Sequence, residues 1–157
     1  MSDTSTFDPD AFMAAEVEGA SSLRLVPVPD GDYTSIIDKL DLRQGTGQDG
    51  KVYTILDITH ALQEQELREA LERDTINVRQ SIFLDIDPTT GGIDMREGKN
   101  TRLGRLRDAV GQNGDGPWNP RMLEGAGPLL VHVTERPDKN DPDTIYNDVS
   151  RTAPLAA

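Results

Sequence analysis

The stretch INVRQSIFLDID (residues 76–87) alternates apolar and polar side chains almost without interruption. One face of this stretch carries Ile76, Val78, Ile82, Leu84 and Ile86. An alternation of period two predicts a β-strand with one buried face. The opposite face carries Arg79 and Phe83 four residues apart, among polar neighbours. A large aromatic ring on the exposed face of a strand indicates a binding surface, and base stacking is one use for such a ring.

The composition of the chain bounds its class. A length of 157 residues predicts one domain with appendages and a single modest core. The absence of cysteine excludes disulfides and thiolate metal sites. The sequence lacks an apolar run of about 18 residues, and its N-terminus (MSDTSTFDPD) is acidic and polar. We therefore expect no membrane span, no signal peptide and a cytoplasmic location.

The charge distribution says more than the net charge of −12, which argues against nucleic-acid binding over the whole surface. Residues 96–126 hold six bases against four acids. This basic island consists of Arg96, Lys99, Arg102, Arg105, Arg107 and Arg121. A local basic patch on an acidic body still attracts a phosphate backbone. The alternative is a solvated helix face whose bases pair with nearby acids.

Turn residues and hydrophobic periodicity divide the chain into strands and helices. Strands are expected at residues 33–42, 51–60, 76–87, 129–136 and 144–151. Helices are expected at residues 9–18, 62–73 and 101–110, with Asp8 and Asn100 as N-caps of the first and third. A bulge midway along the first strand reconciles its two apolar faces. The inward residues of the second and fourth strands are expected to be Val52, Leu56, Ile58, Leu129, Val131 and Val133.

The element order is three strands, a helix and two strands, which predicts a mainly β protein of the OB-fold class. That fold is a five-stranded Greek-key barrel, here with residues 101–110 as the helix between strands 3 and 4. Residues 62–73 form an inserted helix between strands 2 and 3. The expected organisation is an N-terminal arm (1–26), an OB-fold domain (27–152) and a C-terminal tail (153–157).

Strands 2 and 3 of an OB fold present the ligand face. Tyr53 on the second strand and Phe83 on the third have the parity for that face, as does Arg79. We expect the two rings to stack bases. The bases expected to contact phosphates are Lys51, Arg79, Arg96, Lys99, Arg102 and Arg105. The alternative is that the rings pack beneath the 62–73 helix or the N-terminal arm.

The chain resembles a family of small phage-encoded proteins, mostly uncharacterised, for which an OB fold that binds single-stranded DNA is the usual inference. The resemblance covers most of residues 7–152 and is largely strand and turn pattern. Its motifs are FDPDAF (7–12), VPVPDGDY (26–33), GKNTRLGRLR (98–107), AVGQN (109–113), LEG (123–125) and YNDV (146–149). It implies an accessory protein of DNA metabolism, with no catalytic residues to carry over. The chain ends TAPLAA rather than in the acidic tail of better-known single-strand binders.

Other chemistries fit the sequence less well, and we expect neither an enzyme nor a bound cofactor or metal. The motif GTGQDG (45–50) satisfies G-x-G-x-x-G, but a strand rather than a helix follows it. Asp85 and Asp87 begin a calcium-loop pattern that lacks its glycine and its final glutamate. His60 with Glu64 supplies only two metal ligands. Trp118 is expected in the core.

The prediction is a single-stranded-DNA-binding protein of phage DNA metabolism. The first alternative is a non-enzymatic interaction or structural component of a phage particle or complex, in which the acidic arm docks on a neighbour. The second is an acidic mimic of DNA. The sequence does not decide whether the ligand is DNA or RNA. It also leaves open whether the protein forms a homo-oligomer or has a replication protein as partner.

Overall fold

The structure, a computed structural model, describes residues 6–22 and 24–155. Parts of the expected arm (residues 1–5 and 23) and of the expected tail (156–157) lie outside the described residues. Among the described residues, none of the helices is long and apolar enough to cross a membrane.

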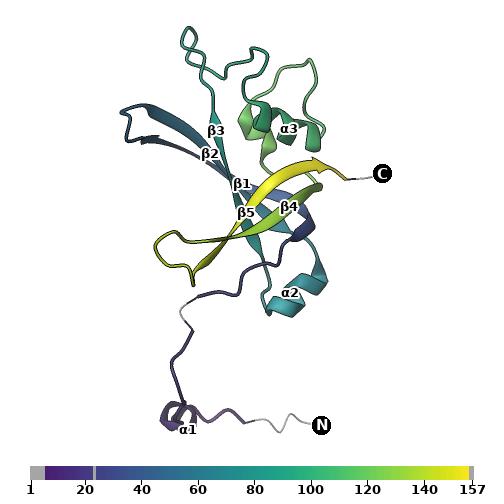
Figure 1. Cartoon of the computed structure of the whole chain (residues 1–157). Coiled ribbons are helices and arrows are strands. Elements are labelled where there is room, and N and C mark those ends of the chain that lie inside the picture. The colour runs from purple at the N-terminus through teal and green to yellow at the C-terminus, as the bar shows by residue number, and fades with distance from the viewer. Residues whose placement is uncertain (1–5, 23, 156–157) are drawn as a thin grey trace.

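A single antiparallel sheet of five strands forms the body, as the mainly β prediction required (Figure 1). Its order is β3-β2-β1-β4-β5. The strands are β1 (Gly31–Thr46), β2 (Val52–Leu62), β3 (Asn77–Leu84), β4 (Leu129–Pro137) and β5 (Ile145–Pro154). The sheet coils so that its edge strands β3 and β5 approach each other. No ladder joins these two strands within the described ranges, so the sheet stays open.

The strand ends differ from the prediction where pairing continues past the apolar pattern. The first strand reaches Thr46 and the last reaches Pro154, because each keeps a partner strand over its whole added length. The third strand ends at Leu84 instead of Asp87, and Ile86 pairs only with Ile93 in an isolated bridge. The predicted bulge in the first strand is confirmed between Ile37 and Lys39.

The helices are shorter than predicted. They are α1 (Pro9–Ala14), α2 (Gln65–Leu71) and α3 (Thr101–Ala109), with a 3₁₀ turn, η1 (Pro120–Leu123). The side chain of Asp8 caps α1 as predicted, but α1 buries no residue, so packing adds nothing that would extend it. Leu62 belongs to β2, and Glu72 in the left-handed conformation ends α2.

Asn100 precedes α3 but does not cap it with its side chain. Its backbone is left-handed, with φ of 52°, and its side chain turns back toward the end of β3. There the amide oxygen accepts from the backbone N–H of Asp85 at 2.7 Å, and the amide nitrogen donates to the Asp85 carbonyl at 2.8 Å. Asn100 therefore fixes the start of α3 against β3.

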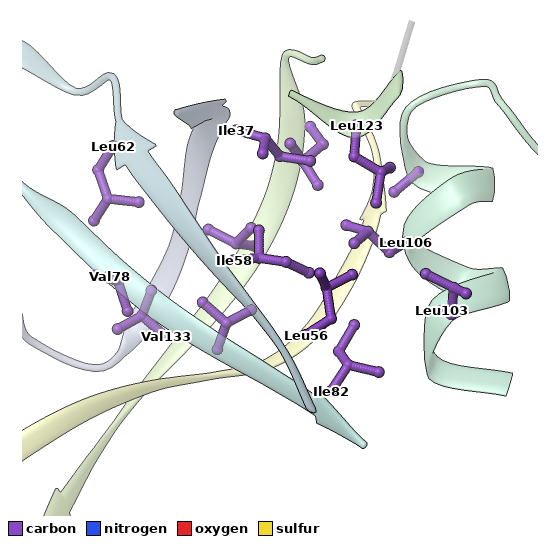
Figure 2. Packing of buried hydrophobic residues seen from close by; sticks show 14 of the residues in the cluster. Ile37, Leu56, Ile58, Leu62, Val78, Ile82, Leu103, Leu106, Leu123 and Val133 are labelled. Carbon is purple, nitrogen blue, oxygen red and sulfur yellow. The ribbon is translucent and has the colours of Figure 1, made fainter. Parts of the chain in front are cut away.

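The core lies between the coiled sheet and α3 (Figure 2). Leu103 and Leu106 of α3 point toward the sheet residues Leu56, Ile58 and Ile82. The predicted inward residues Leu56, Ile58, Leu129, Val131 and Val133 are all buried. Val52 is the exception and is 64% exposed. It lies beside the β1–β2 turn, where the hairpin extends past the core.

A buried polar triad crosses the core between β1, β2 and β3. The Ser35 hydroxyl and Nδ1 of His60 are 2.8 Å apart, and Nε2 of His60 is 2.8 Å from the amide oxygen of Gln80. An amide oxygen only accepts, so Nε2 carries the proton and Nδ1 accepts from Ser35. Burial lowers the pKa of His60, although the Gln80 hydrogen bond acts the other way.

This lowered pKa predicts acid-sensitive stability. Below the unfolded-state pKa of about 6.5, His60 binds a proton in the unfolded chain but stays neutral in the folded protein. The free energy of unfolding therefore decreases as the pH is lowered. The slope is at most about 1.4 kcal/mol per pH unit for one proton. Urea unfolding between pH 7.5 and 5 measures it. His60→Gln should flatten this window; a slope equal to that of the unchanged protein would contradict the assignment.

Candidate nucleic-acid interface

The two predicted rings meet on the outer face of the β2–β3 ladder. The register pairs Phe83 with Ile55, which places Phe83 diagonally opposite Tyr53. The ring centroids are 5.7 Å apart with planes at 61°, an edge-to-face contact. Phe83 is 58% exposed. The alternative in which Phe83 is buried beneath a helix or the arm is therefore wrong.

Tyr53 is held in place by the β1–β2 turn. Its hydroxyl donates to Oδ2 of Asp49 at 3.0 Å, while Oδ1 of Asp49 accepts the backbone N–H of Lys51 at 2.9 Å. These bonds, the one from the Lys51 backbone first and the one from Tyr53 second, lower the pKa of Asp49. Gly47 packs so closely on the ring that a Cβ there would lie 2.7 Å from Cε2 of Tyr53. Tyr53 is thus half-buried and orients Phe83, whose ring offers the larger free surface.

Gly47→Ala is expected to displace the Tyr53 ring, because its Cβ would also meet Asp49 at 2.9 Å. Overpacking of this kind typically costs about 1–3 kcal/mol. The change is read in the near-ultraviolet circular dichroism of the tyrosines and in the free energy of unfolding. Gly45→Ala is the matched control, since a Cβ at Gly45 has nothing within 4 Å. Identical spectra for the two variants would contradict the tight packing.

A polar network lies beside the rings on the same face. Arg43 donates through Nε to Oδ2 of Asp57 at 2.6 Å, and the Ser81 hydroxyl donates to Oδ1 at 2.6 Å. Burial would raise the pKa of Asp57, but the hydrogen bonds from Arg43 and Ser81 outweigh it and lower the pKa. Asp57 therefore stays ionised, with Arg43 balancing its charge. In the same ladders Ile55 is opposite both Arg43 and Phe83 and is buried.

Sequence reasoning missed Arg43 and its partners. Parity places Asp57 and Ser81 on the outer face, but the pairing of β1 with β2 decides which side chain reaches Asp57. The bulge after Ile37 shifts that pairing by one residue. A pair search across the two strands, with the bulge included, would have found Arg43 near Asp57.

The predicted bases divide into two groups. Arg79 is exposed on β3, and Nη1 of Arg102 donates to the Ser81 carbonyl at 3.4 Å, beside the rings. Lys51 is exposed next to the turn that holds Tyr53. We call Arg43, Lys51, Tyr53, Arg79, Phe83 and Arg102 the ring face.

The other predicted bases form an ion pair or line other depressions of the surface. Arg96 forms an ion pair with Asp94 at 2.6 Å, and its hydrogen bonds lower the pKa of Asp94 to about 2. Lys99 is exposed in a shallow depression with Met95 and the start of α3. Arg105 lines a different depression, beside the C-terminal end of β5.

Arg107 of the basic island is not a surface base. It is buried, its guanidinium lies 4.2 Å over the ring of Trp118, and it donates to the Gln112 carbonyl. Nε1 of Trp118 donates to the side chain of Gln112 at 2.8 Å. Trp118 packs against the core as expected.

An apolar groove of about 610 Å³ lies on the inner side of the β1–β2 hairpin, behind the ring face. Its walls include Leu40, Leu42, Leu56, Leu84, Ile86 and Ile93, and its rim carries Asp41, Arg121 and Glu124. Sequence reasoning did not predict this groove, because it assigned Leu56, Leu84 and Ile86 to the buried faces of their strands.

The other candidate chemistries are accounted for by local structure. Gly45 and Thr46 are the last residues of β1 and pair with β2, and the residues that follow, from Gly47 to Lys51, form the turn of the β1–β2 hairpin. Asp85 accepts from the backbone of Asn100 and Asp87 from that of Thr89. His132 pairs with Asp32 at 2.7 Å. Within residues 6–22 and 24–155, no three histidine or acidic side chains gather as metal ligands.

Comparison with protein-family models finds no match, and comparison with curated proteins finds none either.

Proposed function

We propose that this protein binds single-stranded DNA on the ring face of an OB-fold barrel. The sheet order β3-β2-β1-β4-β5, with β3 close to β5 and α3 between β3 and β4, is compatible with that fold. The ligand face of the fold then coincides with the outer side of β2 and β3. The OB-fold assignment and the nucleic-acid ligand are both part of this proposal.

The single observation that supports the proposal most is the exposed Phe83 ring, backed edge-on by Tyr53 and flanked by bases. Exposing an aromatic ring to water is unfavourable, and stacking of a base on the ring removes this exposure. Because the ring is already held rigidly, the protein loses little entropy when the base binds. Arg79, on the same side of β3 as Phe83, and Arg102, which donates to the Ser81 carbonyl, are the bases that we propose balance the phosphates next to a stacked base.

The resemblance noted in the sequence supports a place in phage DNA metabolism, in the host cytoplasm and without catalytic activity. A protein-interaction role in a phage particle or replication complex is the second candidate, and the exposed Phe7 and Phe12 of the arm favour it. An acidic DNA mimic would rely on the net charge instead.

Salt titration of oligonucleotide affinity tests the proposal. Fluorescence anisotropy of a labelled oligothymidylate should give a logarithmic salt slope near −0.7 per phosphate contact. Arg102→Ala should reduce the magnitude of the slope by about 0.7, because it removes one contact. Arg121→Ala, at the rim of the groove, is the matched control and should leave the slope unchanged. Absence of binding at low salt would contradict the proposal, and equal binding to duplex DNA would remove its single-strand preference.

A further inference from the structure

The N-terminal arm exposes an apolar surface that nothing in the described chain covers. Phe12 of α1 is 67% exposed and Met13 is 81% exposed. Phe7 packs on Phe12 with ring centroids 5.6 Å apart, so the two rings form one projecting pair. None of the α1 residues is buried. Such a projecting aromatic pair is typical of an anchor for a partner surface.

The charge of the arm restricts what that surface is. Residues 6–22 contain four acids, Asp8, Asp10, Glu16 and Glu18, and no base. The segment FDPDAF (7–12) places two carboxylates, Asp8 and Asp10, between two aromatic rings, Phe7 and Phe12. A short single strand of DNA likewise combines planar rings with anions. The arm therefore matches a receiving surface that offers rings together with bases.

The groove and the ring face both carry exposed apolar side chains, and their charges separate them as receivers of the arm. The rim of the groove carries Asp41 and Glu124 beside Arg121, so it would repel the carboxylates of the arm. The ring face offers Phe83 together with Arg79 and Arg102, neither of which forms an ion pair with a described residue. Charge complementarity favours the ring face.

The route of the arm points to another copy rather than to its own body. The guanidinium of Arg24 is anchored to Asp141 and Thr144, at 2.6 Å each, in the β4–β5 connection. Beyond this anchor α1 extends past the α2 end of the molecule, whereas the β1–β2 turn and α3 lie at the opposite end (Figure 1). The arm thus leaves the body away from its own ring face.

We propose that α1 of one copy docks on the ring face of a second copy, in the site proposed above for single-stranded DNA. The Phe7–Phe12 pair takes the place of bases, and Asp8 and Asp10 take the place of phosphates. Self-association and DNA binding then compete for one surface. The contact joins two different surfaces, so it is head-to-tail and generates rings or chains of copies.

Sedimentation velocity of the full-length protein over a concentration series tests this inference, with an unlabelled oligothymidylate as competitor. We expect association that grows with protein concentration, weakens with salt and is reversed by the oligonucleotide. The double variant Phe7→Ala/Phe12→Ala should raise the midpoint of association about tenfold or more. Val17→Ala is the matched control, because Val17 is also exposed in the arm but lies outside the segment 7–12 that is proposed to dock.

The outcomes separate this inference from the proposed function on which it rests. A wild-type protein that stays monomeric while binding DNA overturns the docking alone. If the protein is monomeric and the double variant binds DNA more tightly than the wild type, the arm docks on the ring face of its own chain. This result would overturn docking between copies. If the copies stay associated in the presence of saturating oligonucleotide, the arm binds a surface other than the ring face. This result would overturn the proposal that the arm and DNA share one site. Association that Phe83→Ala abolishes, without any DNA affinity, supports the docking and removes the DNA function.

Discussion

Phe83→Ala is expected to weaken binding of single-stranded DNA by about 5- to 150-fold. Stacking of a base on an aromatic side chain contributes roughly 1–3 kcal/mol, and each 1.4 kcal/mol is about tenfold in affinity. Phe83 offers the larger free ring surface of the pair, since Tyr53 is half-buried against Gly47 and Phe83. Truncation at position 83 therefore removes most of the stacking surface. Anisotropy of a labelled oligothymidylate at low salt measures the change.

The control for this variant must remove exposed apolar surface from the same hairpin without touching the ring face. Val52→Ala does so, because Val52 is 64% exposed at the end of β2 and has the opposite parity from Tyr53. Phe83→Trp should retain binding, since it keeps a planar ring. Unchanged affinity in Phe83→Ala, in a protein with native circular dichroism, would contradict the stacking role.

The outer face was predictable because strand parity is local. Period-two alternation in residues 76–87 separates Phe83 and Arg79 from the buried Val78 and Ile82 whatever the strand pairs with. The contact between Phe83 and Tyr53 needed more than parity. It depends on the register that sets Ile55 opposite Phe83, and sequence patterning does not fix a register between strands joined by a helix.

The polar half of the site was beyond sequence patterning for a related reason. Asp57 reads as an ordinary exposed carboxylate, yet Arg43 and Ser81 converge on it from two neighbouring strands. The bulge in β1 decides that Arg43 rather than its neighbour reaches Asp57. Long-range register and one inserted residue thus determine which charges meet.

The basic island shows the limit of counting charges along the chain. Arg107 is buried under Trp118, and Arg96 is paired with Asp94 two residues earlier. Arg102 of this stretch donates a hydrogen bond to the Ser81 carbonyl of β3, two residues before Phe83. The periodicity of the nine-residue helix α3 predicts which of its bases share a face with the buried leucines. It does not predict which loop packs against those bases.

Leu106→Ala is expected to lower the free energy of unfolding by about 2–5 kcal/mol, the usual range for truncating a fully buried leucine. Leu106 is fully buried, and with Leu103 it joins α3 to the core formed by β2 and β3 (Figure 2). A small domain typically has only about 5–15 kcal/mol of stability in total, so the loss would be a large share. Urea unfolding followed by circular dichroism measures it.

The adjacent Arg105→Ala provides the comparison on the same helix, because Arg105 is exposed and forms no ion pair within the described residues. A surface change of this kind usually stays within about 0.5 kcal/mol. A difference between the two variants means that α3 closes the core that holds β2 and β3 in register, which the ring face requires. Equal stabilities would mean that the sheet folds without α3, and the position of Arg102 beside the rings would then lose its structural basis.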